Sequence, residues 1–134
     1  MRQHRLFWLL AAPVLTTLGL CGGCHQAKSP AATPADVATA QAEAQREVEQ
    51  AQVEARKDVK SAAKVGGNSR DVALARVTGA FDIAMAHADG DRKVAMEKCM
   101  TLQPSAQQAC KDQADADYQT AAASAKAIRV SQQQ

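Results

Sequence analysis

The chain has 134 residues, a formal net charge of +2 and an aromatic content of 3%. Arg2 and Arg5 belong to a leader that export would remove, and the remainder from residue 24 onward then holds 14 basic and 14 acidic residues. A neutral chain lacks the basic patch that both nucleic acid and anionic lipid need as electrostatic partners, and 28 alanines against 18 larger apolar residues among 111 make a core too thin for a deep pocket. We therefore expect no nucleic-acid partner, no enzymatic activity, no metal and no cofactor.

Residues 1–23 are predicted to be a lipoprotein signal peptide. A basic start precedes an apolar run over residues 6–20, which has the length of a signal-peptide core and is too short for a comfortable membrane span. Gly22 and Gly23 then supply the small residues at which bacterial lipoproteins are cut before a cysteine that becomes acylated. Cys24 is therefore the expected attachment site of the lipid, palmitate included, through which the protein would bind a membrane.

The positions around Cys24 leave two alternatives open. Cleavage before Cys21 is the second choice, because it places Leu18 three residues before the cut, where lipoproteins favour leucine, but puts the large Leu20 next to the bond. Cys21, Cys24 and His25 also match the C-x-x-C-H motif of covalent haem attachment. A membrane-anchored c-type haem protein in electron transfer is thus the alternative function.

Residues 24–33 form a flexible linker rich in proline and alanine, which gives a haem pocket few large side chains. The residue after the lipidated cysteine also indicates the membrane. An aspartate there usually retains lipoproteins of this kind in the inner membrane, whereas here His25 follows Cys24. We therefore expect the protein on the periplasmic face of the outer membrane.

A long helix is predicted over residues 34–65, with Thr33 as its cap, Pro34 at the first position and Asp36 at the third. One apolar stripe follows steps of three, four and four residues: Val37, Ala40, Ala44, Val48, Ala51, Ala55, Val59 and Ala62. A repeat of eleven residues predicts a nearly straight helix of roughly 48 Å. The stripe is expected to pack against the following hairpin; the alternatives are a self-associating coiled coil and a helix lying on a lipid surface.

A break at Gly66-Gly67-Asn68-Ser69, with glycines to cap the first helix and polar residues to start the next, leads to a second helix over residues 69–102. Its apolar stripe has nearly heptad spacing: Leu74, Val77, Phe81, Ala84, Ala88, Ala95, Cys99 and Leu102. Asp89-Gly90-Asp91 is predicted to kink or restart this helix, because it lacks the spaced ligands of a calcium loop. His87 is expected on the surface.

Pro104 marks a tight turn into a third helix over residues 105–130, which Ser105 and Gln108 are expected to start as a capping box. Its stripe is Cys110, Ala114, Tyr118, Ala121, Ala125 and Ile128. Residues 131–134 are predicted to be a frayed tail, so the helical domain spans 34–130.

Cys99 and Cys110 lie at similar heights on the second and third helices. Inward-facing Cα atoms of packed helices fall roughly 3.4–5.4 Å apart, which overlaps the window of about 4.4–6.8 Å that a disulfide needs. A bond is therefore predicted, with two buried thiols, or a metal site with His87, as alternatives. The expected fold is all-α: a long Ala-rich helix followed by a disulfide-clipped antiparallel helical hairpin, elongated and coiled-coil-like.

Over residues 80–127 the chain resembles small Ala-rich envelope proteins of Gram-negative bacteria. The resemblance lies in a Lys-Cys pair at 98–99 and an Ala-Cys-Lys-Asp run at 109–112. The resemblance implies a location in the cell envelope and no particular activity, because the function of that family is uncharacterised. The chain is also similar to the major outer-membrane lipoprotein tied to peptidoglycan, but 131–134 lacks that protein's terminal lysine. We expect a structural, stress-related or adaptor role, with an envelope protein or a second copy as partner.

Overall fold

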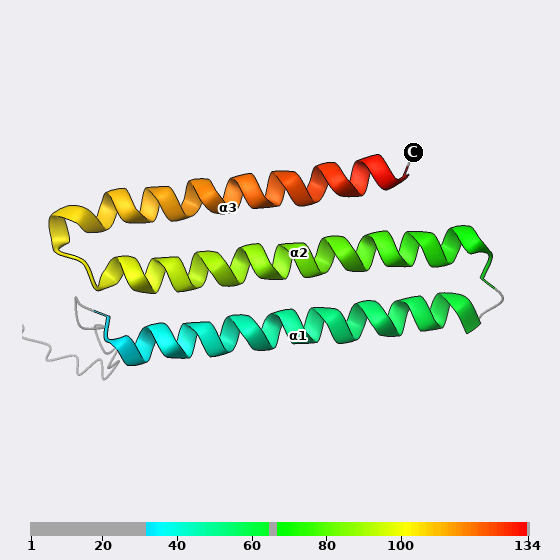
Figure 1. Ribbon diagram of the computed structural model, residues 1–134, viewed down its shortest axis with the longest axis horizontal. Coiled ribbons are helices and arrows are strands. Elements are labelled where there is room, and N and C mark those ends of the chain that lie inside the picture. Colours follow the sequence, from blue (N-terminus) through cyan, green and yellow to red (C-terminus); the bar gives the residue numbers. More distant parts are fainter. Residues whose placement is uncertain (1–31, 65–66, 134) are drawn as a thin grey trace, which may run out of the picture.

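The computed structural model describes residues 32–64 and 67–133. In these two ranges the chain forms three helices and no strand: α1 (Pro34–Lys64), α2 (Ser69–Met100) and α3 (Pro104–Gln133). The helices run antiparallel, side by side, and the chain zigzags through a single layer with α2 in the middle (Figure 1). Within the described part, α1 and α3 each contact α2 and do not contact each other. The predicted all-α fold with its helical hairpin is confirmed.

Hydrogen-bonded caps start α1 and α2. The Asp36 carboxylate accepts hydrogen bonds from the backbone N–H (2.8 Å) and the hydroxyl (2.9 Å) of Thr33, whose hydroxyl oxygen in turn accepts one from the Asp36 N–H (3.3 Å). Pro34 is the first helical residue, as predicted. At α2, the side-chain oxygen of Asn68 accepts a hydrogen bond from the N–H of Asp71 (3.0 Å). Each cap satisfies an N–H group that lacks a partner inside its helix.

The start of α3 differs from the prediction. Its first residue is Pro104, because the missing N–H and fixed φ of proline suit the first helical position. Ser105 therefore lies inside the helix, and its predicted capping box with Gln108 is wrong. The carbonyl oxygen of Gln103 accepts a hydrogen bond from the N–H of Ala106 (2.8 Å), while the Gln108 side chain donates to the following turn.

The other helix ends lie within a few residues of the predicted ones. α2 ends at Met100 rather than 102, because the N–H groups of the next two residues donate to carbonyls three residues back (3.1 and 3.2 Å). α3 continues to Gln133 instead of fraying after 130, since the Ser131 hydroxyl donates to a carbonyl of the previous turn (2.9 Å) and no helix breaker follows. The predicted end of α1 and its cap, residues 65–66, lie outside the described residues.

α1 packs on α2 through its eleven-residue stripe, and all eight residues of that stripe are buried or half-buried. A Cβ added to Gly79 would lie 2.5 Å from the Cβ of Ala55, and one added to Gly90 would lie 2.8 Å from the Cβ of Ala44. Only glycine therefore lets the two helices approach this closely. Ala44 and Ala55 are eleven residues apart, as are Gly79 and Gly90, so the repeat of α1 is matched step by step on the antiparallel α2.

α2 therefore carries a second stripe, toward α1, that its heptad pattern does not reveal. The register of the two glycine contacts places eight buried or half-buried residues in it: Val72, Ala75, Gly79, Ile83, Ala86, Gly90, Val94 and Glu97. The predicted stripe lies on the other side of the helix, where Leu74 (50% exposed) and Leu102 (43% exposed) are its least buried members. The predicted restart at Asp89-Gly90-Asp91 is wrong, because α2 is continuous there and Gly90 serves close packing.

α2 and α3 pack through small side chains and two arginine–aromatic pairs. The buried residues of this interface are Ala88, Cys99, Ala114, Ala122 and Ala125. Arg92 lies over the ring of Tyr118 (5.4 Å to the centroid), and Arg129 lies over that of Phe81 (4.2 Å). The predicted α3 stripe is one residue off at two points. Ala122 is buried in place of the exposed Ala121, and Arg129 is half-buried in place of Ile128, which is 54% exposed. After Tyr118 the steps are therefore four, three and four residues instead of three, four and three.

Candidate functional site

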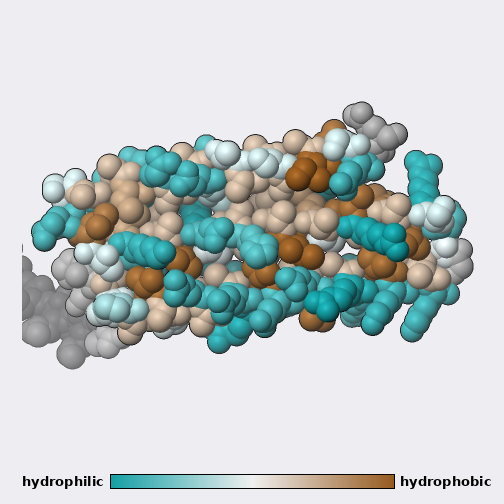
Figure 2. All heavy atoms as spheres, in the orientation of Figure 1, coloured by the Kyte–Doolittle hydropathy of each residue, from teal (hydrophilic) through white to brown (hydrophobic). Residues whose placement is uncertain are grey.

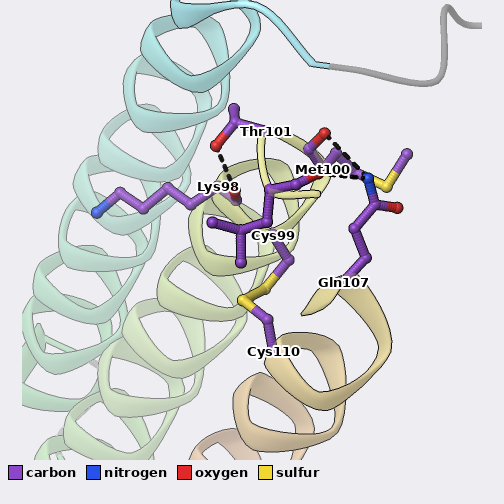
Figure 3. The surroundings of a disulfide bond; sticks show 7 residues. Lys98, Cys99, Met100, Thr101, Gln107 and Cys110 are labelled. Atoms are coloured by element: carbon purple, nitrogen blue, oxygen red, sulfur yellow. Dashed lines mark hydrogen bonds between the residues drawn. A yellow bond between two sulfur atoms is a disulfide. The ribbon is translucent and has the colours of Figure 1, made fainter. Parts of the chain in front are cut away.

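The α2–α3 turn is closed by a disulfide between Cys99 and Cys110 (Figure 3). Their Cα atoms are 5.5 Å apart, inside the range that a disulfide needs. Cys99 is the one fully buried side chain among the described residues, at 0% exposure, whereas Cys110 is half-buried. The bond therefore lies within the α2–α3 interface, with no solvent path to the Cys99 sulfur.

The same end of the layer also receives the chain that enters α1. The backbone N–H of Ala32 donates to the carbonyl oxygen of Met100 (3.2 Å), which also accepts from the Gln107 side chain (3.4 Å). Gln107 donates to the Leu102 carbonyl as well (3.0 Å), and Ala32 is only 7% exposed. Cys24 is eight positions before Ala32, and eight extended steps span at most about 29 Å, so a lipid on Cys24 would lie within that distance of Ala32 at the disulfide end.

The predicted attachment residues lie outside the described residues. Cys21, Cys24 and His25 are all in the segment before residue 32, so both the lipid site and the haem motif stay predictions. His87 is exposed on α2, as expected. Residues 32–64 and 67–133 contain no group of three His, Cys, Asp or Glu side chains placed to hold a metal ion. None of the described helices combines the length and the apolar character needed to cross a membrane.

The two faces of the α1–α2 pair differ in charge. Residues one position before each member of the α1 stripe share one side of that helix, and the charged ones are all acidic: Asp36, Glu43, Glu47, Glu54 and Asp58. We call this side the acidic face. Lys93 of α2 reaches across it to the Glu47 carboxylate (Nζ to Oε1, 2.5 Å). The hydrogen bond to Glu47 is the main cause that raises the pKa of Lys93 above 10.5, with smaller contributions from the nearby charges of Glu43 and Asp89.

On the opposite face, a groove runs between α1 and α2. Its floor consists of Ala55, Val59, Gly79, Ala80 and Ile83, and its rim of Gln52, Arg56, Lys60 and Arg76. We call it the basic groove; it is open to solvent and has a volume of about 480 Å³. Hydrophobic residues lie along the line between α1 and α2 in Figure 2, with hydrophilic residues on both sides. A second hollow of about 360 Å³ adjoins it at Gln52 and contains His87, Glu49 and Asp91.

The residues of the basic groove lie in 52–60 of α1 and 76–83 of α2, toward the end of α1 and the start of α2. In Figure 1 the end of α1 and the start of α2 lie on the right, and the turn between α2 and α3, which the disulfide closes, lies on the left. The segment 56–76, which forms this end, contains six lysines and arginines and only two aspartates. The net charge of the whole chain hides this local excess of four positive charges, because acidic residues elsewhere cancel it. Counting charge separately for each end of each helix would have found the basic groove in the sequence; its floor depends on the register of α1 and α2, which no single helix reveals.

Comparison of this chain with protein families, with curated proteins and with solved structures finds no match. The geometry of the two ends and two faces is therefore the basis on which a function can be proposed.

Proposed function

We propose that this protein is a lipid-anchored adaptor of the Gram-negative envelope, attached through Cys24 to the periplasmic face of the outer membrane and not an enzyme. The signal-like leader, the glycines before Cys24 and the following linker support the anchor. Ala32 is bound to the Met100 carbonyl at the disulfide end, so the linker leads to that end and the remote end is directed away from the lipid.

The observation that carries the adaptor role is the arrangement of the helices in one layer. α2 has neighbours on two opposite sides, so no other described helix covers either broad face of the α1–α2 pair. Grooves between neighbouring helices are where a third helix packs in a bundle. One groove is basic and the other face acidic, which gives two surfaces able to select different partners.

The anchor is tested by fractionation and mass. We expect the native protein to fractionate with outer membranes, to incorporate labelled palmitate and to gain the mass of a lipid on the fragment that begins at Cys24. Cys24→Ala should abolish all three, whereas Cys21→Ala should leave them intact. Membrane association of Cys24→Ala at unchanged mass would contradict the proposal, and a Soret band in the purified native protein would favour the haem alternative.

The adaptor role is tested by photocrosslinking in living cells. A photoreactive side chain at Gln52 samples the basic groove, one at Glu54 samples the acidic face, and one at the exposed Ala123 of α3 is the matched control. We expect a discrete adduct with another envelope protein from one of the first two positions and none from Ala123. Adducts with a second copy would indicate self-association instead, and the absence of any adduct from both faces would contradict the adaptor role.

A further inference from the structure

The geometry points to a ligand site that the adaptor role does not require. We infer that the basic groove binds a single-chain amphiphile, with its acyl chain on the apolar floor and its anionic head group, a carboxylate or a phosphate, among Arg56, Lys60 and Arg76.

The floor of the groove fits an acyl chain. It is formed by five aliphatic or glycine residues, of which Ala55 and Gly79 are the pair that brings α1 and α2 closest together. The side chains of Val59, Ala80 and Ile83 complete the floor of this shallow channel. From Gln52 to Lys60 the channel runs for about 12 Å along α1. A single extended chain matches the length of such a space.

The rim of the groove fits an anion. Its charged residues are Arg56, Lys60 and Arg76, and no aspartate or glutamate lines the groove. Within the described residues, none of the three takes part in an ion pair. Arg56 donates from Nε to the Gln52 backbone oxygen (3.2 Å) and from one terminal nitrogen to the Gln52 side chain (3.3 Å), which holds its guanidinium at the rim and leaves further N–H groups for a ligand.

The charge of the surrounding segment strengthens the preference of the groove for an anionic head group. The six basic and two acidic residues of 56–76 make this end of a neutral protein locally positive. The acidic face lies on the other side of the α1 stripe, so its carboxylates do not line the groove. An anionic head group is therefore attracted to this end, and the attraction weakens with salt because the three cations are exposed.

The binding test uses residues 24–134 with Cys24→Ser, which contain every described contact and carry no lipid of their own. Decanoate and decyl phosphate, kept below the concentrations at which they form micelles, are titrated while backbone amide shifts are recorded by NMR. We expect saturable shifts around Gly79 and Ala80, absent with acetate and at least roughly tenfold weaker with decanol, because decanol cannot form charge-assisted hydrogen bonds. Each methylene added between octanoate and dodecanoate should tighten binding roughly two- to fourfold.

Variants separate the two halves of the site. Arg76→Gln and Lys60→Gln should each weaken decanoate binding roughly tenfold, while Arg46→Gln, an exposed arginine of α1 outside the groove, should leave it unchanged. Ala80→Trp should block the floor, and because Ala80 is exposed the helical circular dichroism should be preserved. Equal affinity for decanol and decanoate, shifts outside the groove, or binding to anionic vesicles but not to the monomeric amphiphile would each overturn the inference. None of these results depends on the lipid at Cys24 or on the crosslinking outcome.

Discussion

α2 is held on its two sides by different means. Toward α1 it offers glycines, and the contact is a close approach of helix backbones at Gly79 and Gly90. Toward α3 it offers Cys99, Arg92 and Phe81, and the contact combines a covalent bond with two arginine–aromatic contacts. Both sides bury small residues, but glycine allows the backbones to meet on the α1 side, whereas the α3 side adds a cross-link and two arginine–aromatic pairs.

The two interfaces of α2 should be disrupted by different kinds of change. Where backbones are in van der Waals contact there is no space for an added atom. The α1–α2 interface should therefore be disrupted when a glycine in it is replaced by a larger residue. The α2–α3 interface depends on the state of one bond and on a few long side chains, so it should fail when these are removed. Five changes, in order of decreasing effect, test this difference.

Gly79→Leu is expected to have the largest effect. Even a Cβ added at this position would lie too close to Ala55, so a leucine must force α1 away from α2. The expected cost is about 3 kcal/mol in the free energy of unfolding. Urea denaturation followed by circular dichroism measures that cost. The matched control is Thr78→Leu, one residue away and exposed, which should change stability by less than about 0.5 kcal/mol.

Gly79→Ala sharpens the same test. Alanine favours a helix by about 1 kcal/mol over glycine, so in the absence of a close contact the variant would be more stable than the native protein. We expect it to be less stable, because the alanine Cβ would lie 2.5 Å from that of Ala55. A stabilised variant would show that α1 and α2 lie further apart than described.

Reduction of the Cys99–Cys110 bond should lower stability by roughly 2–3 kcal/mol, since the bond closes a loop of about 12 residues in the unfolded chain. For a domain of this size the melting temperature should fall by roughly 8–20 °C, with most of the helical signal retained at low temperature. Cys99→Ala with Cys110→Ala should melt like the reduced protein. Complete thiol labelling of unreduced, denatured protein would mean that the bond does not form.

Arg92→Ala should cost about 1 kcal/mol. Arg92 contacts both the Tyr118 ring and the Asp115 carboxylate (2.6 Å), but nearly half of each charged side chain is exposed, which limits the gain from the ion pair. Arg129→Ala, which loses only the contact with Phe81, should cost less. Thermal melting of the two variants, in low and in high salt, checks the order; only the Arg92 difference should shrink with salt.

The smallest effect concerns Lys93 and alkaline pH. Its pKa is raised in the folded protein, so its pairing with Glu47 contributes fully below the ordinary value of 10.5 and is lost as the pH rises through the folded value. Both side chains are exposed, and the change in melting temperature should be small. Glu47→Gln should remove most of this alkaline dependence, whereas Glu49→Gln, on the other side of the α1 stripe, should keep it.

The predictive value of the sequence differed between the helices for a physical reason. α1 buries one side, so its eleven-residue period appears directly in the sequence, and all eight stripe residues are buried or half-buried. α2 buries two sides, and its apolar stripes toward α1 and toward α3 overlap in the sequence. Only the nearly heptad stripe toward α3 could therefore be recognised from the sequence. Gly90 was interpreted as an interruption because glycine disfavours an isolated helix. Its contact with Ala44 depends on how α1 pairs with α2, which the sequence of neither helix reveals by itself.

The cysteine pair was predictable because turn, spacing and helix geometry agree on it. The capping of α3 was not, because Ser105 and Pro104 both offer a start and the proline at the first position prevails. The basic groove combines residues from α1 and α2, so its floor required the register that the glycine contacts fix.

The zigzag path also bears on how the molecule folds. Each helix contacts only the helix that precedes or follows it, so nearly all contacts form across a short connection and the mean sequence separation of contacts is low. Such topologies fold fast, because little loop entropy is lost before contacts form. With Cys99 and Cys110 joined, the α2–α3 hairpin remains tethered even when its contacts open. After each local opening it can therefore act as the template on which α1 folds back.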